Sequence, residues 1–241
     1  MAFDGITLNA VVNELQILKG AKVNSINQPD KNSIVISVYN GNNFAINIDT
    51  SANNYRIHLT THSRKNPLNA LNFCMCLRKQ LNRAKIDSIY MKDLERICYI
   101  KFSTYNEMND LVNKTLIIEL MGKYSNMILV NENFKIIDAL KKFDNFDVLN
   151  HSENFDSLKK EESNDGLTEK SRGIMPGREY IEPVDEKYNF KKTSENEFIE
   201  IIEKSSYKTL ESAIPNLFTG ISKLFVQNII NTLELTNTIS R

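Results

Sequence analysis

The chain has 241 residues, with 41% hydrophobic and 25% charged side chains and a formal net charge of zero. These values are typical of a soluble globular protein with one large or two small domains, and the neutral charge gives no sign of a nucleic-acid binder. The N-terminus has no basic stretch followed by an apolar one, and no apolar run is long enough to span a membrane. With only three cysteines, this predicts a cytoplasmic protein with reduced thiols and argues against a secreted or wall-anchored adhesin.

The first part of the chain shows one helical pattern followed by strand-like patterns. Apolar residues from Leu8 to Leu18 recur at helical spacing, and Gly20 follows as the expected end of the helix. In the third strand-like segment, Ile46 and Ile48 alternate with polar neighbours, which predicts one buried and one solvated face. The expected strands cover residues 22–28, 33–39, 43–50 and 55–60.

A second helix is expected to start at Asn66-Pro67 and to run to about Arg83, with an apolar stripe that includes Phe73 and Leu77. Further strands are expected at residues 86–91, 96–103, 115–121, 127–130 and 134–139. Helix, four strands, helix and five more strands predict an α+β fold with antiparallel strands. We interpret this order as a sandwich of two sheets with flanking helices.

The chain changes character after residue 143. Residues 144–170 are rich in Asp and Glu and poor in apolar side chains, which predicts a mobile acidic loop. Within this loop, residues 150–170 are expected to be the most protease-sensitive part. Residues 172–183 are interpreted as an ordered connector, and helical patterns follow. Gly220 and Ser222 either end one helix and cap the next, or form a hairpin whose amides face a phosphate.

Charge is unevenly distributed along this neutral chain. Between Arg56 and Lys101 there are ten basic and three acidic side chains. Such segregation either forms a patch that attracts a polyanion or is spread over the solvated faces of several elements. Arg78 and Lys79 belong to this segment and lie on one flank of the second expected helix.

Residues 116–130 comprise two apolar runs joined by a loop that contains Gly122, which predicts a β-hairpin. The loop places Lys123 beside Tyr124, and a cation next to a stacking surface suits nucleic-acid backbone and bases. The alternative is a plain turn with a solvated lysine. Glu119 lies within the first apolar run, so we expect an inward salt bridge to a basic residue.

No pattern for metal or cofactor chemistry emerges from the sequence. The candidate metal ligands are His58, His62, Cys74 and Cys76. Their spacing is poor, because cysteines two residues apart point to different sides of a helix. No P-loop, nucleophile elbow or H-E-x-x-H motif is present. The prediction is therefore a protein without metal, without cofactor and without enzymatic activity.

Six segments occur in the order seen in one protein family: MAFDG, VVNEL, NQPDKN, FCMCLRKQL, LERI and IIELMGKYSNMILV. The chain resembles the NFACT family, which includes the bacterial RqcH proteins and carries the older label fibronectin-binding protein A. The likeness is strong over residues 1–140 and weaker over 171–230. It implies an NFACT N-terminal domain over residues 1–175, similar to the N-terminal domain of formamidopyrimidine-DNA glycosylases. A connector and part of a helix-hairpin-helix domain would occupy residues 176–241.

The resemblance implies an RNA-binding factor of ribosome-associated quality control. It would bind tRNA, alanyl-tRNA in bacteria, and the obstructed large ribosomal subunit, and would support C-terminal tailing of the stalled chain. Glu95 and Arg96 match the family's Asp-Arg pair tied to tRNA binding, with Glu in place of Asp. If both serve one ligand, they must lie in the turn before the strand, because adjacent strand residues point to opposite faces. With Lys123, Arg78 and Lys79 they form the expected tRNA-binding set.

Two other functions stay open at the level of sequence. The older family label suggests an adhesin for fibronectin or fibrinogen. The glycosylase-like fold suggests a DNA-binding protein, but without catalysis, because those enzymes use an N-terminal proline and this chain begins Met1-Ala2-Phe3-Asp4. The family continues with a coiled coil and a second NFACT domain, so the resemblance also implies an N-terminal fragment of a longer protein.

Overall fold

A computed structural model describes residues 3–144, 172–183 and 186–239. The acidic loop expected at residues 144–170, including its protease-sensitive part, lies outside the described residues apart from Asp144. The first part of the chain contains α1 (Gly5–Glu14), η1 (Leu15–Leu18), β1 (Lys22–Asp30), β2 (Ser33–Asn40), β3 (Asn42–Asp49), β4 (Arg56–Leu59) and α2 (Asn72–Leu81). It continues with β5 (Lys85–Met91), β6 (Ile97–Tyr105), β7 (Leu111–Glu119), η2 (Gly122–Tyr124), β8 (Asn126–Asn131) and β9 (Ile136–Ala139), followed by α4 (Glu195–Lys204), α5 (Leu210–Leu217) and α6 (Lys223–Thr232).

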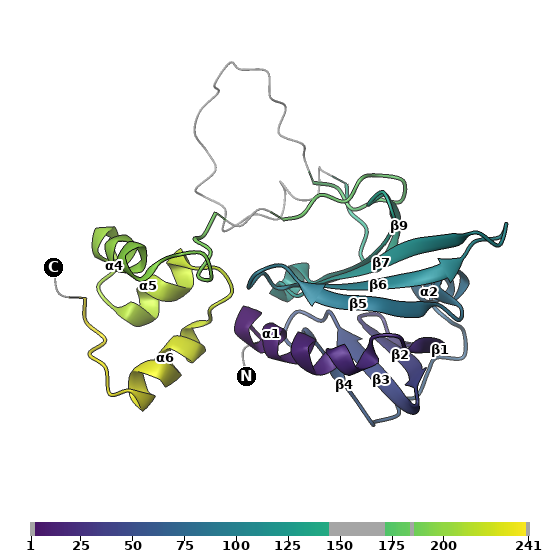
Figure 1. Ribbon diagram of the computed structural model, residues 1–241, viewed down its shortest axis with the longest axis horizontal. Helices are drawn as coiled ribbons and strands as arrows, with labels where there is room; N and C mark the ends of the chain where they lie inside the picture. The colour runs from purple at the N-terminus through teal and green to yellow at the C-terminus, as the bar shows by residue number, and fades with distance from the viewer. Residues whose placement is uncertain (1–2, 145–171, 184–185, 240–241) are drawn as a thin grey trace, which may run out of the picture.

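The nine described strands form one antiparallel sheet in the order β4-β3-β2-β1-β5-β6-β7-β8-β9. The α+β fold with antiparallel strands is confirmed. β1 and β5 share a single register pair, Lys22 with Lys85, supported by backbone hydrogen bonds such as that from the Val23 amide to the Ala84 carbonyl at 2.8 Å. The sheet therefore consists of two halves that meet at this short pairing. Side chains from both halves, from α1 and from α2 share one core, which makes the arrangement sandwich-like (Figure 1). The two layers are halves of one sheet rather than two separate sheets.

Side-chain alternation places the core as expected in the first half of the sheet. Ile46 and Ile48 on β3 are fully buried, and they face this core. In the second half, β6 is apolar on both faces, with Cys98 and Ile100 in the main core and Tyr99 in a second cluster behind it. A strand that is buried on both faces needs a cover on each side.

The second helix begins later than the sequence predicts, at Asn72 instead of Asn66-Pro67. Leu68 is fully exposed, and Phe73 is the first residue of the helix to reach the core. Helical stability in proteins comes mainly from packing of an apolar face, so the unsupported first turn does not form. The helix ends at Leu81, shortly before a residue with positive φ.

The second apolar face of the sheet is covered by the connector, here residues 172–183 (Figure 1). Ile174 and Tyr180 pack against β6, β7 and β8. Glu119 of β7, only 1% exposed, accepts hydrogen bonds from the Tyr180 hydroxyl at 2.8 Å and from the Arg172 guanidinium. The expected inward salt bridge of Glu119 is thus present, and its partner belongs to the connector.

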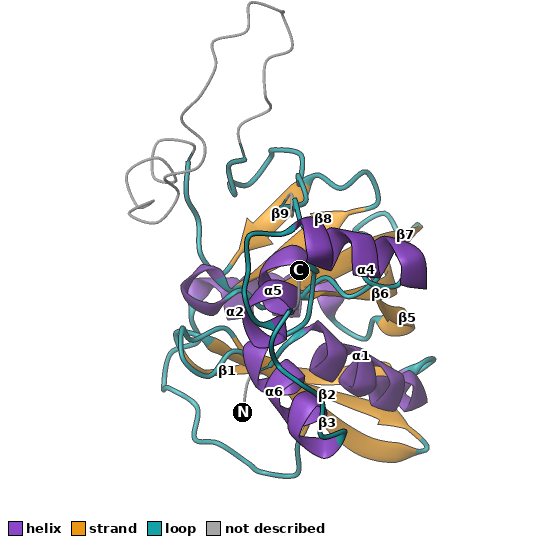
Figure 2. Ribbon diagram, turned by 90° about the vertical axis from the view of Figure 1, so that its left-hand side faces the viewer, coloured by secondary structure: helices purple, strands orange, loops and turns teal. Residues whose placement is uncertain are grey.

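The last three described helices form a helical module, here residues 186–239 (Figure 2). This module has its own core around Phe218, Ala213 and Val226. Ser222 caps α6 by accepting from the Phe225 amide at 3.2 Å, as one interpretation of this segment predicts. Gly220 does not itself end a helix, because α5 ends at Leu217 with Phe218 as its C-cap, and Gly220 lies in the following turn with a φ of +77°. A domain boundary near residue 175 stays a prediction. In the described part of the chain, no helix combines the length and apolar character needed to cross a bilayer.

We predict that Arg172→Gln destabilises the fold by about 3–5 kcal/mol, because it leaves the Glu119 carboxylate buried without its cation. The measurement is urea unfolding at pH 7. Arg178→Gln is the matched control on the same connector, since Arg178 pairs with half-exposed Asp144 at 2.8 Å. An exposed pair of this kind contributes less than about 1 kcal/mol.

The same variant is expected to show a characteristic pH dependence. Burial raises the pKa of Glu119 above its ordinary value of 4.5, while Arg172 and Tyr180 oppose this shift. Without Arg172 the pKa of the folded state rises further, so stability is lost as pH increases from the unfolded-state value upwards. The destabilisation by Arg172→Gln should therefore be larger at pH 7 than at pH 5. Equal destabilisation at both pH values would show that the Glu119 carboxyl group is not ionised in its pair with Arg172.

Candidate nucleic-acid interface

The turn between β5 and β6 holds two of the predicted tRNA-binding residues. Glu95 and Arg96 lie just before Ile97, the first residue of β6, as the sequence argument required for residues that serve one ligand. The Arg96 carbonyl accepts a hydrogen bond from the Leu120 amide at 2.8 Å, which fixes the backbone. Within the part of the chain that the structure describes, the half-buried Arg96 guanidinium has no hydrogen bond or ion pair.

The turn between β7 and β8 lies at the same end of the sheet, because Ile97 pairs with Glu119. Here Lys123 is exposed, and its Nζ lies 5.0 Å from the centroid of the Tyr124 ring, within the range of a cation–π contact. Ser125 closes the turn, since its hydroxyl accepts from the Met121 amide at 2.8 Å. The cation and the stacking surface predicted from the sequence therefore lie side by side on a turn that a hydrogen bond closes.

A half-buried lysine supports this turn from behind. Lys141 Nζ donates to the carbonyl of Ser125 at 2.6 Å and to that of Thr50 at 2.8 Å. It thereby links the turn to the other half of the sheet. Burial lowers the pKa of Lys141, while the nearby Asp49 carboxylate opposes that shift. The β7–β8 turn is thus held from behind by a bridge to the other half of the sheet.

Arg78 and Lys79 do not join this group. Arg78 donates to the Ile26 carbonyl at 2.7 Å and to the Asn27 side chain at 2.9 Å, which ties α2 to β1. Lys79 pairs at 3.3 Å with Glu107, which lies beyond the far end of β6. A strand of nine residues places its two ends roughly 27 Å apart. The structure therefore brings Glu95, Arg96 and Lys123 to one end of the sheet and leaves Lys79 at the other.

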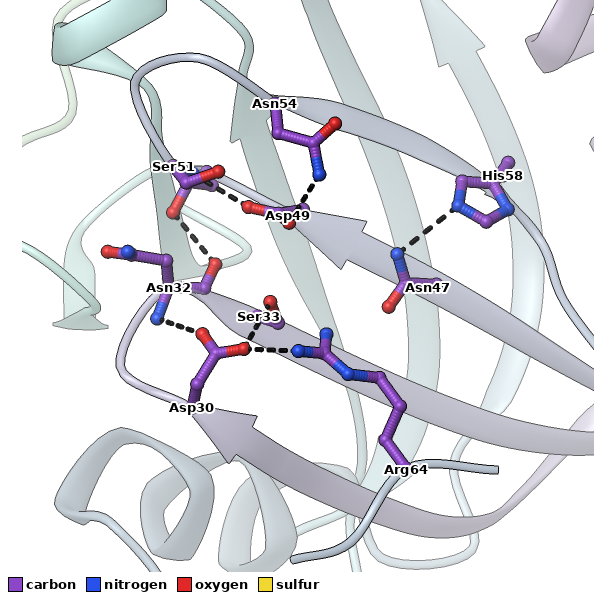
Figure 3. A network of polar contacts seen from close by, with 10 residues as sticks. Asp30, Asn32, Ser33, Asn47, Asp49, Ser51, Asn54, His58 and Arg64 are labelled. Carbon is purple, nitrogen blue, oxygen red and sulfur yellow. Dashed lines mark hydrogen bonds and ion pairs between the residues drawn. The ribbon is translucent and has the colours of Figure 1, made fainter. Parts of the chain in front are cut away.

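The positive charge of the segment between Arg56 and Lys101 is partly neutralised by acidic partners from outside it. Arg64 pairs with Asp30 at 2.6 Å at the turn between β1 and β2 (Figure 3). Lys92 pairs with Glu182 of the connector at 2.7 Å. Lys79 is paired with Glu107 as well. These three basic side chains therefore lie on different elements, as expected if the charges of the segment are spread over several solvated faces.

The four candidate metal ligands are held in unrelated places. His58 Nε2 lies 3.3 Å from the Asn47 side chain (Figure 3), and its Nδ1 lies 2.7 Å from the Leu59 carbonyl. Cys74 lies on the buried face of α2, where desolvation raises the pKa of its thiol. Among the residues that the structure describes, no three potential ligands gather into a group that could hold a metal ion.

A junction that no pattern in the sequence predicts adjoins the β5–β6 turn. Asp4 caps α1 by accepting from the Thr7 amide at 2.9 Å, and its second oxygen accepts from the Ser222 hydroxyl at 2.6 Å. Since Ser222 caps α6, this bond joins the starts of two helices (Figure 1). Gly5 donates to the Gly220 carbonyl at 2.8 Å. Asp4-Gly5 and Gly220-Ile221-Ser222 are both short turn-like motifs. Because 218 positions separate Asp4 from Ser222, nothing in the local sequence indicates that the two motifs pair.

The helical module and the connector also make charge contacts with the β5–β6 turn and its neighbours. Lys192 Nζ lies 2.9 Å from the carboxylate of Asp93, and this hydrogen bond lowers the pKa of Asp93. On the face of the sheet that the connector covers, the Tyr99 hydroxyl donates to Glu182 at 2.8 Å. Glu182 also hydrogen-bonds Lys92, and this contact raises the pKa of Lys92. The Arg96 turn is thus surrounded by paired groups from the connector and the helical module.

The fold defines a class of protein: a bent antiparallel sheet with a docked helical module and a basic turn at one end. A family model described as NFACT N-terminal and middle domains matches residues 4–147. The chain belongs to the NFACT family.

Relatives and solved structures agree with this assignment. The chain is 30% identical over 241 residues to the "Rqc2 homolog RqcH" of Streptococcus suis and 27% identical over 245 residues to that of Bacillus subtilis. These matches cover 98% and 100% of the chain but 39% of each relative, so the chain spans about two fifths of their length.

Two similar solved structures carry a different kind of name. The N-terminal domain of the fibronectin-binding protein PavA of Streptococcus pneumoniae has a TM-score of 0.78 at 29% identity, covering 97% of this chain and 80% of that one. The N-terminal part of the fibronectin/fibrinogen-binding protein of Streptococcus suis has a TM-score of 0.78 at 29% identity, covering 98% and 81%.

We predict that Asp4 and Ser222 stabilise the protein through one shared hydrogen bond. Asp4→Asn keeps an oxygen for the Thr7 amide but removes the charged acceptor of Ser222, and hydrogen bonds to charged groups contribute about 1.5–3 kcal/mol. In urea unfolding, the double variant Asp4→Asn/Ser222→Ala should lose less stability than the two single variants together. Ser194→Ala, which removes the cap of α4, is the control and should add to Asp4→Asn. Additive losses for Asp4 and Ser222 would contradict the shared bond.

Proposed function

We propose that this chain is the tRNA-binding N-terminal part of a ribosome-associated quality-control factor. In this proposal the protein works in the cytoplasm, binds tRNA, alanyl-tRNA in bacteria, and engages the obstructed large ribosomal subunit. It supports C-terminal tailing of the stalled chain by positioning RNA, while the ribosome supplies the peptidyl-transfer chemistry. The names of the curated relatives support the quality-control role.

The observation that carries the proposal is the arrangement of Arg96 and Lys123 at one end of a rigid sheet. A guanidinium holds phosphate through two parallel hydrogen bonds or stacks on a base. Lys123 beside Tyr124 offers a phosphate contact next to a ring on which a base can stack. Such a pair of turns suits a folded RNA, in which unstacked bases and backbone lie close together.

The remaining members of the predicted set take secondary roles in this proposal. Glu95 shares the turn with Arg96 and stands where the family pattern has Asp. Arg78 and Lys79 would contact phosphate elsewhere along an extended RNA. Because Arg78 already binds the β1 backbone, its loss should affect folding as well as binding.

A second candidate function has one observation in its favour. Both solved structures with TM-scores of 0.78 are named for fibronectin or fibrinogen binding. In that case an extracellular-matrix protein would be the partner, and RNA affinity would be absent. Binding to immobilised fibronectin, measured beside tRNA binding with the same protein sample, separates the two.

We predict that Arg96→Ala weakens tRNA binding by about 1–3 kcal/mol if the contact is direct. Arg96→Lys should lose most of the same affinity, because an ammonium cannot reproduce the planar fork. Lys123→Ala should cost less and lower the salt dependence, as the loss of one phosphate contact does. The measurement is tRNA binding at two salt concentrations, with duplex DNA as competitor.

Two controls make this experiment decisive. Circular dichroism checks that each variant is folded, and Lys19→Ala removes an exposed cation that lies outside the predicted site. Unchanged affinity in folded Arg96→Ala would reject the site. If the unaltered chain binds no tRNA, the same series in a longer protein of this family tells whether further domains are needed or the RNA-binding proposal fails.

We also predict no glycosylase or lyase activity on DNA with oxidised bases. The N-terminal proline amine that such enzymes use as a nucleophile is not present at the start of this chain. Borohydride reduction in the presence of damaged DNA should therefore trap no covalent adduct. A trapped adduct at the N-terminus would overturn this prediction, and a glycosylase of known activity is the positive control.

A further inference from the structure

Two glycines from opposite ends of the chain close on one carbonyl group. A Cβ added to Gly5 would lie 2.0 Å from the Leu94 carbonyl oxygen, and one added to Gly220 would lie 2.1 Å from the same atom. The two glycines are also bonded to each other, since the Gly5 amide donates to the Gly220 carbonyl at 2.8 Å. Leu94 itself is buried. Only glycine permits backbones to approach this closely.

The enclosed carbonyl belongs to the turn that carries Arg96. Leu94 stands two residues before Arg96, and the turn is closed by the Glu95 amide, which donates to the Lys92 carbonyl at 3.1 Å. On its other side, the Arg96 carbonyl is held by the Leu120 amide. With so short a chain between two fixed points, the direction of the Arg96 side chain follows from the contact at Leu94.

We propose that Gly5 and Gly220 are positioning residues for Arg96, so that docking of the helical module sets the RNA-binding turn. This inference rests on the proposed function and names how that site is held. The hairpin before α6 then contacts protein instead of nucleic acid. Its Ser222 amide faces the Asp4 carboxylate at 3.3 Å, in the place where a phosphate would lie in a nucleic-acid-binding hairpin.

The test compares glycine variants by what the new methyl group of each one meets. Gly220→Ala and Gly5→Ala push against the Leu94 carbonyl from two sides. Gly41→Ala is the matched control for backbone strain, because Gly41 has a φ of +73°, close to that of Gly220, with nothing within 4 Å of an added Cβ. Ser222→Ala loosens the same contact without adding atoms, and it decides the question if the crowded variants do not fold.

Two measurements on these variants are informative. Hydrogen exchange at the Leu120 amide reports on the Arg96 backbone, with amides in the β1–β2 pair as a folding control. We expect faster exchange at Leu120 in Gly220→Ala and Gly5→Ala and no change in Gly41→Ala. Affinity for tRNA should fall by about two- to a hundredfold, the range that coupled neighbouring residues span. In an Arg96→Ala background the same glycine variants should have no further effect on affinity.

The outcomes separate this inference from the proposed function. Unchanged exchange at Leu120 in folded variants overturns the positioning role, whatever the RNA affinity. An affinity loss that persists in the Arg96→Ala background also overturns it, because the hairpin would then act on RNA by another route. If exchange changes as expected but the unaltered protein binds no tRNA, the mechanical link stands and the RNA-binding function fails.

Discussion

The structure depends on one constraint, which is that the middle strands of the second half-sheet are apolar on both faces. Ile117 of β7 and Ile128 of β8 are fully buried, although they point away from the main core. These side chains require a second cover, and the connector provides it by packing Ile174 and Tyr180 over them. Hydrophobic burial alone does not fix the position of the connector along the sheet, because the hydrophobic effect is non-directional.

Polar contacts supply the direction that burial lacks. The buried Glu119 carboxylate holds the connector at its start through Arg172, and Glu182 holds it near its end through Tyr99 and Lys92. A buried pair of this kind contributes little net stability, but breaking it is costly, so it selects one register. That register leads the chain back towards the β5–β6 turn, and the helical module therefore docks beside α1.

Local patterns in the sequence predict much of this fold. The alternation along β3 predicts its buried face, and an isolated acid in an apolar strand predicts a salt bridge for Glu119. What the sequence does not reveal is the partner in each case. Arg172 is separated from Glu119 by 53 positions, and Ser222 from Asp4 by 218. Contacts at such distances depend on the path of the whole chain, which no local period encodes.

The candidate site shows the same division. A basic segment is visible in the sequence, but its charges are divided by pairing that only the folded chain establishes. Lys79 of α2 pairs with Glu107 in the turn between β6 and β7, whereas Arg78 donates to the Ile26 carbonyl of β1. Arg96 differs from both because its backbone is held from two sides while the described chain leaves its guanidinium without a partner. Charge in sequence therefore overstates the number of cations available to a polyanion.

An arginine on a loop is a weak binding element unless the loop is already fixed. Ordering a side chain on binding costs about 0.5–1.5 kcal/mol, and ordering the backbone beneath it adds to that cost. In this chain the cost is met during folding, when α1 and the α5–α6 hairpin close on the Leu94 carbonyl. The helical module thus has a physical role at this end of the sheet even if none of its atoms touches a ligand, because it converts a flexible turn into a preorganised one.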